Sequence, residues 1–238
     1  MIMDAIIINI SGNWGHFKKV DTNNNPLTHD FITKTALIGL IGAINGIERS
    51  GMKNLFPELS EDILYSVALN KHVKKESWGF TLRSVKVNTE KAPWQFEFLK
   101  SPDFTVVIAL KNDRSKKIFD DFALNVQNGY ACYNPTLGLA NCPADISFVS
   151  LATTSERKSG AFETKGFISK NHQIDITKSF DFRIGFEKVP TYQDNDFWND
   201  PEKYAEVAYC SPGSTFRVKM GDYYNISSNN EKSQWYLI

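Results

Sequence analysis

The chain has 238 residues, and its 27 Lys and Arg balance its 27 Asp and Glu, so the formal net charge is zero. A hydrophobic content of 42% and an aromatic content of 13% exclude a largely disordered chain, and the neutral charge excludes a protein that binds polyanions with its whole surface. Three cysteines cannot form a paired disulfide framework, so we expect a reducing compartment and a cytoplasmic protein.

The first 51 residues predict a strand, a polar loop and a buried helix. Residues 3–10 are apolar and end in a Ser-Gly pair, which favours a first strand over a signal peptide. Thr33 or Thr35 caps the next helix, which is apolar around most of its surface and is expected to end at Gly51. The helix glycines share one face, where a strand or an RNA backbone could come close. No apolar run is long enough to predict a membrane span.

The middle of the chain predicts further strands, a long hairpin and a second helix. The expected elements are strands at 65–69, 103–110 and 146–152, a hairpin over 71–100 with arms at 77–88 and 94–99, and a helix capped by Asn112 or Asp113. Together with the first strand and helix, this order predicts an α+β fold of the ferredoxin-like, RRM type for residues 1–152. Two helices would then cover one face of an antiparallel sheet and leave the other face free.

Residues 153–238 predict a β-rich C-terminal extension. Its expected elements are strands at 166–169, 173–177, 180–186 and 214–218, and a short helix near 201–207. The stretch 181–206 holds an excess of acidic residues, and we interpret it either as a protein interface or as a solvated loop.

Aromatic and basic residues are interleaved in two places, and this combination can stack on bases and pair with phosphates. The loop after the first strand contains Trp14, Gly15, His16, Phe17, Lys18 and Lys19. The hairpin contains Trp78, Phe80, Trp94 and Phe96 among basic residues, so it is either a charged ribbon that packs its aromatics on the sheet or a finger that reaches over RNA. Three roles stay open for His16: a loop histidine whose hydrogen bonds are satisfied within the protein, an RNA contact, or a general acid–base group.

The sequence lacks the common motifs of nucleotide, zinc-protease and serine-hydrolase sites. The glycines between Gly39 and Gly46 lie inside the predicted helix, so their amides are not available to a phosphate. Cys132 and Cys142 have no nearby histidine and are expected to be core thiols rather than zinc ligands. We therefore expect no cofactor and no metal.

Three segments together resemble a known family. They are Ser-Gly-Asn-Trp-Gly-His-Phe-Lys-Lys at 11–19, the Gly-punctuated helix that begins with Thr-Lys-Thr-Ala-Leu-Ile-Gly at 33–39, and Tyr-Asn-Pro-Thr-Leu-Gly-Leu-Ala at 133–140. In this order they resemble the Cas five-type RAMP subunit of the type I CRISPR interference complex, Cascade, closest in style to the type I-B branch. The resemblance is clear over residues 5–150 and weaker over 151–238. It implies an RRM-like RAMP domain with a β-hairpin thumb inserted after its second strand, here at about 71–100.

The resemblance also implies a function in antiviral defence. A subunit of this kind binds the 5′ handle of the crRNA, caps the filament of Cascade backbone subunits and supports docking of the large subunit. It meets target DNA only within the complex and has no membrane partner.

Residues carried over by position form four groups. Trp14, Gly15, His16, Phe17, Lys18 and Lys19 would line the handle pocket, and Lys34 and Thr35 would meet phosphate. Lys71, His72, Lys74, Lys75, Trp78 and Arg83 would be the contacts of the thumb, and Tyr133, Leu137 and Gly138 would form a second wall.

Two alternatives stay open beside this hypothesis. One branch of the family is a metal-independent endoribonuclease that processes crRNA with a Tyr, Lys and His set. The residues available here would be His16, Tyr65, Lys71 and His72, but no triad aligns, so we expect no catalytic residues. The other alternative is a ferredoxin-like domain that binds a small molecule or a protein.

Overall fold

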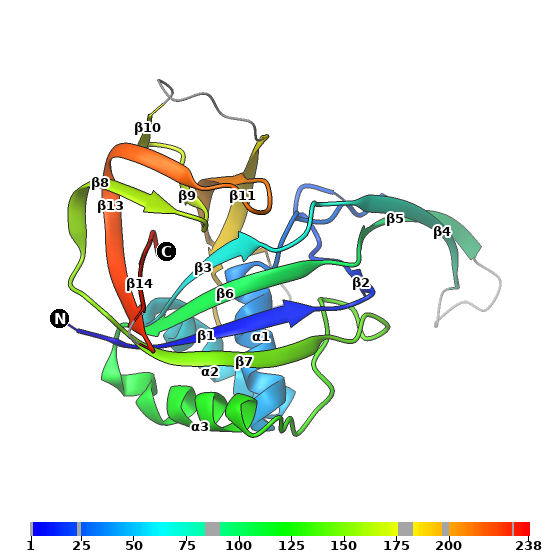
Figure 1. Cartoon of the computed structure of the whole chain (residues 1–238). Helices are drawn as coiled ribbons and strands as arrows, with labels where there is room; N and C mark the ends of the chain where they lie inside the picture. Colours follow the sequence, from blue (N-terminus) through cyan, green and yellow to red (C-terminus); the bar gives the residue numbers. More distant parts are fainter. Residues whose placement is uncertain (1, 23–24, 84–90, 176–182, 197–199, 230) are drawn as a thin grey trace.

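The computed structural model describes the chain except residues 1, 23–24, 84–90, 176–182, 197–199 and 230, and except the side chains of 82–83 and 91–92 (Figure 1). Its helices are α1 (Lys34–Asn45), α2 (Arg49–Asp62) and α3 (Lys116–Gln127), with a 3-10 turn at Asp113–Ser115 before α3. Its strands are β1 (Asp4–Ser11), β2 (Trp14–Gly15), β3 (Ile63–Leu69), β4 (Lys75–Arg83), β5 (Lys91–Lys100), β6 (Asp103–Leu110), β7 (Asp145–Thr154), β8 (Lys158–Thr164), β9 (Ile168–Ser169), β10 (Gln173–Ile174), β11 (Ile184–Tyr192), β12 (Lys203–Cys210), β13 (Phe216–Ser228) and β14 (Glu231–Trp235).

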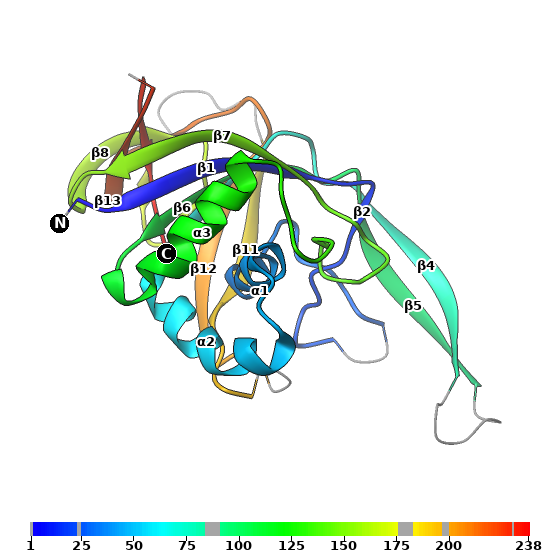
Figure 2. The ribbon, with the colours of Figure 1, turned by 90° about the horizontal axis from the view of Figure 1, so that it is seen from below.

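The fold is a mixed α+β fold built on antiparallel sheets. The central sheet has the order β10-β13-β7-β1-β6-β3, and β8 and β14 also pair with β13. β1 lies between β6 and β7 and pairs antiparallel with both, with Ile8 opposite Val106 on one side and Phe148 on the other. Figure 2 shows the three helices together on one face of this sheet.

Both faces of the central sheet are covered at β1, which explains why the strand is apolar almost throughout. Ile6, Ile8 and Ile10 are fully buried in the cluster that contains the core residues of α1. On the other face, Ala5 and Ile7 pack in a second cluster with Trp235 and Leu237. The expectation of a free second face is therefore wrong here, because the end of the chain covers part of it.

The helices differ from the prediction at their junction. α1 begins after Thr33, whose side-chain oxygen accepts from the amide of Ala36, and it ends at Gly46 in the left-handed region at φ 72°. Gly51 does not end α1 but lies inside α2, a helix that the prediction missed. A Cβ on Gly42 would overlap the sulfur of Met52, so at this glycine α1 packs against α2. Gly46 faces Cys132 instead, and a Cβ on Gly39 would meet open space. Among the described helices, none is long and apolar enough to cross a membrane.

The predicted hairpin is formed by β4 and β5, paired from Lys75–Leu99 at its base to Arg83–Lys91. It projects away from the body of the protein in both views (Figures 1 and 2). Pro93 was expected in the turn but pairs with Thr81 inside β5, and residues 84–90 at the end of the hairpin lie outside the described part. β2 pairs with β5, so the loop after β1 is attached to the base of the hairpin.

The secondary-structure elements that the structure describes in the C-terminal region are all strands. β11 and β12 pair over most of their length, and β9 adds to β12. The short helix expected near 201–207 is wrong, because Lys203–Cys210 is β12 and buries Val207, Ala208 and Cys210 against neighbouring strands. The strands expected at 173–177 and 180–186 begin or end in residues outside the described part, with β10 and β11 as their described portions.

Candidate nucleic-acid interface

An aromatic cluster lies where β2 meets the base of the hairpin. The rings of Trp14 and Trp78 meet edge to face with centroids 4.5 Å apart, and Phe98 packs against both. Trp78 is 41% exposed, so much of its ring is open to solvent. The amide of Ser101 donates to the carbonyl of Asn13 at 2.8 Å, which ties the loop before Trp14 to the turn that follows β5.

Basic residues surround this cluster. We call Trp14, Lys71, His72, Lys74, Trp78 and Lys100 the hairpin-base surface. Lys71, His72, Lys74 and Lys100 line one cavity of about 450 Å³ together with Asn70, Ser101 and Pro212.

Lys100 connects the cavity to the aromatic cluster. Its ammonium lies 5.9 Å from the centroid of the Trp14 ring and also pairs with Glu76. Lys71 pairs with Asp103 at 3.2 Å, whereas the side chains of His72 and Lys74 have no bonded partner within the described residues. The surface therefore combines an open indole with unpaired polar groups, which suits stacking on a base beside a phosphate.

His16 is placed inside the protein. It is 3% exposed, its Nδ1 donates to the carbonyl of Glu97 at 2.7 Å, and the rings of Phe96 and Phe98 flank it. Burial lowers the pKa of the imidazole, and this effect outweighs the opposing hydrogen bond to Glu97. A neutral, hydrogen-bonded and buried His16 positions the loop against the hairpin and offers no charge to a phosphate.

The remaining residues of the loop after β1 are divided between interior and surface. Phe17 is buried, and its amide donates to Thr28 Oγ1 at 2.8 Å. Lys18 is exposed. Lys19 donates to Glu187 Oε1 at 2.9 Å, and the side chain of Glu187 is only 2% exposed. In this loop Lys18 is exposed, whereas Trp14 and Lys19 are half-buried, and Lys19 is engaged by Glu187.

Lys75 is also engaged within the protein. Its ammonium lies 2.7 Å from Asp30 Oδ1 and 3.2 Å from Glu97 Oε1, and it donates to the carbonyl of Thr28. Burial alone would lower the pKa of Lys75, but the hydrogen bonds and charges of Asp30 and Glu97 raise it overall. Arg83 ends β4, and its side chain lies outside the described part.

The Leu137–Gly138 segment packs directly on the loop after β1. The amide of His16 donates to the carbonyl of Leu137 at 2.9 Å, and Leu137 is fully buried. Gly138 has φ 90°, and a Cβ there would overlap the carbonyl oxygen of His16. Tyr133 lies apart from this contact, exposed and beside Gly39 and Ala43 of α1.

Lys34 and Thr35 lie at the start of α1 and away from the hairpin. Thr35 is half-buried, and its hydroxyl lies 3.2 Å from that of Thr33. Lys34 is 4% exposed and lines a different cavity, next to the start of β3. β3 has 7 residues, which at about 3.3 Å per residue places its two ends about 20 Å apart.

A family comparison decides the identity of the chain. The family model described as CRISPR-associated protein (Cas_Cas5) matches residues 6–199. The chain belongs to the Cas5 family. No curated protein matches it in the sequence comparison.

The chain is also similar to solved structures. A CRISPR protein from Archaeoglobus fulgidus is similar over 98% of this chain and 99% of that chain, with 14% identity and a TM-score of 0.56. A chain of a CRISPR RNA-guided surveillance complex is similar over 97% of this chain and 91% of that chain, with 12% identity and a TM-score of 0.43. At 14% identity the similarity to the A. fulgidus structure shows a shared fold.

The four residues considered for RNA cleavage in this Cas5 chain do not lie together. Lys71 and His72 are on the hairpin-base surface, and His16 is buried behind it. Tyr65 is fully buried in the middle of β3, and burial raises the pKa of its hydroxyl. No group of three His, Cys, Asp or Glu side chains that could hold a metal ion occurs in the described ranges.

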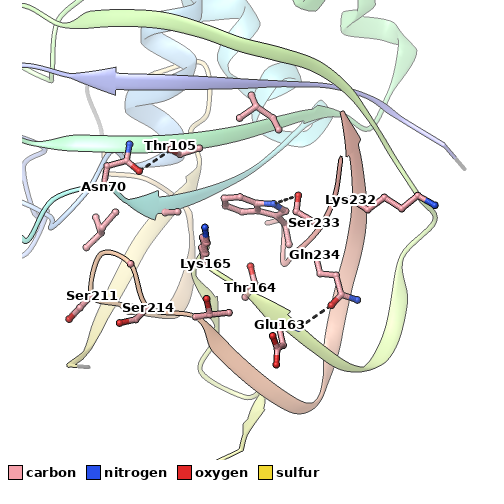
Figure 3. A pocket seen from close by; sticks show the side chains of 16 residues that line it. Asn70, Thr105, Glu163, Thr164, Lys165, Ser211, Ser214, Lys232, Ser233 and Gln234 are labelled. Carbon is pink, nitrogen blue, oxygen red and sulfur yellow. Dashed lines mark hydrogen bonds between the residues drawn. The ribbon is translucent and has the colours of Figure 1, made fainter. Parts of the chain in front are cut away.

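A second cavity of this Cas5 chain adjoins the hairpin-base surface through Asn70 (Figure 3). It has a volume of about 650 Å³ and lies between the end of β3 and the C-terminal strands. Thr105 donates to Asn70 Oδ1 at 3.0 Å on the sheet side, and Lys165 points into the cavity from the segment after β8. The prediction missed Asn70, Lys100 and Lys165. Only the fold brings Asn70, after β3, beside Lys165, which follows β8.

Proposed function

We propose that this Cas5 chain is the subunit of a CRISPR interference complex that binds the 5′ handle of a crRNA at the hairpin-base surface. The proposal includes the interpretation of residues 1–152 as an RRM-like RAMP domain. In this interpretation β4 and β5 are the inserted thumb, and residues 153–238 are the C-terminal extension. The order β7-β1-β6-β3 with its helices on one face supports that reading.

The observation that carries the proposal is the arrangement of Trp78, Trp14 and Lys100. An exposed indole is held edge to face by a second indole, and a lysine stands over that second ring. Aromatic side chains that are fixed in this way stack on unpaired bases, and single-stranded RNA segments offer such bases. His72 and Lys74 line the adjoining cavity and are available to the phosphates of the same segment.

We propose that the chain binds RNA without cleaving it. A general base must lie within hydrogen-bond reach of the hydroxyl it deprotonates, and a tyrosine must reach the substrate. Tyr65 is enclosed in the core, and the Nδ1 of His16 is occupied by a backbone carbonyl. These contacts support a binding role for the site.

We further propose that the partners are the backbone and large subunits of Cascade, as the family resemblance implies, and that target DNA is met only in that complex. Exposed Leu124 of α3 and Leu151 of β7 line one pocket and support a protein partner, because exposed apolar side chains that gather on one face favour protein contacts. The type I-B assignment and a cytoplasmic location belong to the same proposal.

The experiment is fluorescence anisotropy of a labelled 5′-handle RNA with the purified protein in EDTA, at two salt concentrations. Trp78→Ala removes the exposed indole and should weaken binding roughly five- to hundredfold, because stacking contributes about 1–3 kcal/mol per base. Tyr130→Ala is the matched control, since Tyr130 is an exposed aromatic residue at the end of α3. It should leave the affinity unchanged.

The same samples are then run on a denaturing gel. Intact RNA with salt-dependent binding supports the proposal, because phosphate contacts produce a salt slope. Cleaved RNA would contradict this proposal and support the endoribonuclease alternative. Equal loss of affinity in both variants, or the absence of binding, would contradict the site at the hairpin base.

A further inference from the structure

One face of the hairpin base carries a carboxylate among its basic and aromatic residues. Glu76 and Trp78 are two positions apart in β4, so their side chains lie on the same face, and Lys100 at the end of β5 shares that face. The side chain of Glu76 is 40% exposed and pairs with Lys100. A negative charge opposes the approach of a phosphate, so a carboxylate at this surface calls for an explanation.

Two residues of the proposed RNA site hold Glu76 in place. The ammonium of Lys100 and the indole N–H of Trp78 both donate to its carboxylate. The hydrogen bond from Lys100 is the main cause of the lowered pKa of Glu76, so the carboxylate is ionised at neutral pH. Glu76 therefore fixes the orientation of the exposed indole, and it engages an ammonium that is then less available to a phosphate.

The carboxylate retains positions for further donors. An ionised carboxylate accepts hydrogen bonds at about four lone-pair positions, and Lys100 and Trp78 donate to it at two of them. Because the side chain is partly exposed, a ligand can reach the other positions. Glu76 thus offers acceptors, and no donor, to a group that lies beside Trp78.

The chemistry of these acceptors favours one base. A base that stacks on the exposed ring of Trp78 lies next to the carboxylate, because the N–H edge of the indole is bonded to it. On its Watson–Crick edge guanine presents two adjacent donors, the N1 imino and N2 amino groups, which match the two oxygens of a carboxylate. Adenine and cytosine present a ring-nitrogen acceptor beside their amino group, and uracil presents carbonyls on both sides of its imino group. Each of these three bases would therefore place an acceptor against Glu76.

We propose that Glu76 selects guanine at the hairpin-base surface, where the base stacks on Trp78 and donates from N1 and N2 to the carboxylate. The inference rests on the proposed function, because it requires RNA at this surface, and it goes beyond that function by assigning base choice to one residue. Glu76 lowers the affinity for any phosphate, since it engages Lys100, and it adds discrimination between bases.

The test is fluorescence anisotropy of the full chain in EDTA, at two salt concentrations, with a labelled oligouridine and with the same RNA whose central base is guanine, adenine or cytosine. The parent protein should bind the guanine RNA roughly five- to hundredfold more tightly than the other three, as a bidentate base contact allows. Glu76→Gln replaces one acceptor oxygen by a donor, so the preference for guanine should be lost. The same variant releases Lys100, so it should bind oligouridine more tightly and with a steeper salt dependence.

Asp103→Asn is the matched control. Asp103 pairs with Lys71 at 3.2 Å, so the variant also releases a lysine at the same cavity, but it leaves Glu76 and Trp78 as they are. It should raise the affinity for all four RNAs and keep the preference for guanine.

The outcomes separate this inference from the proposed function. If none of the four RNAs binds, both are wrong. If the parent protein binds RNA without preferring guanine, if the preference survives Glu76→Gln, or if Asp103→Asn removes it as well, base selection by Glu76 is wrong while handle binding at the hairpin base still stands.

Discussion

The burial of the Lys34 ammonium predicts that removal of this charge stabilises the protein. Burial, followed by the nearby charge of Lys111, lowers the pKa of Lys34 from 10.5 to about 8. At about 1.4 kcal/mol per pH unit, this difference corresponds to about 3 kcal/mol of stability lost by the folded state at neutral pH. Lys34→Met keeps the length of the side chain without the charge, so we expect the variant to be more stable by up to about 3 kcal/mol at pH 7.

The sign of the pH dependence follows from proton binding. Between pH 8 and 10.5 the unfolded chain keeps the proton on Lys34 while the folded protein releases it. The stability of the parent protein should therefore rise with pH across this window relative to the variant. Below about pH 8 both states bind the proton, and the difference between the two proteins should be constant.

Urea denaturation in phosphate-free buffer at several pH values between 7 and 10.5 measures this difference. Lys117→Met, at an exposed lysine of α3, is the control and should change stability by no more than about 0.5 kcal/mol. A stability difference that does not shrink as the pH rises would refute the reasoning, as would a parent protein more stable than Lys34→Met at pH 7.

Two other predictions concern interior contacts. Glu187→Gln should cost about 3–5 kcal/mol in urea denaturation, because it leaves the ammonium of Lys19 and the ring of His29 without their buried carboxylate. Burial opposes ionisation of Glu187, but the hydrogen bonds of His29 and Lys19 lower its pKa overall, so its contribution should be lost as the pH falls below the ordinary range of a glutamate. Gly138→Ala should cost at least about 1–3 kcal/mol from its positive φ and its overlap with a backbone carbonyl, whereas Gly79→Ala, with open space around it, is the control and should cost little. A Gly138→Ala protein with the melting temperature of the parent would contradict the packing described here.

The elements with a strong local signal were predictable from the sequence. β1 and β6 are continuous apolar runs because both of their faces are covered, and Thr33 caps α1 as its position suggests. α2 was missed because Gly51 and Pro57 interrupt it and few of its residues are buried apolar ones. The position of α2 depends on its contact with α1, and the pattern of residues along the sequence does not show that contact.

The acidic stretch 181–206 shows that the sequence alone also does not predict which charged side chains remain available in the folded protein. The sequence allowed residues 181–206 to be an interface or a solvated loop, but most of the described residues there form β11 and β12. Glu187 of β11 is buried among Lys19 and His29, which are more than 150 residues away in the chain. Since ion pairs between distant segments depend on the fold, net charge by segment does not show which charges remain available.

The availability of charge also bears on how a neutral protein would bind one RNA segment. Lys19 and Lys75 are engaged by internal carboxylates, whereas the side chains of Lys18 and Lys74 have no bonded partner within the described residues. The electrostatic part of RNA affinity grows with the number of phosphates that a protein neutralises. With few unpaired lysines near the hairpin base, the proposed handle binding has to draw on stacking at Trp78 and on the shape of the cavity beside it. Such a site selects an RNA segment with a splayed base rather than any polyanion, which is consistent with a net charge of zero.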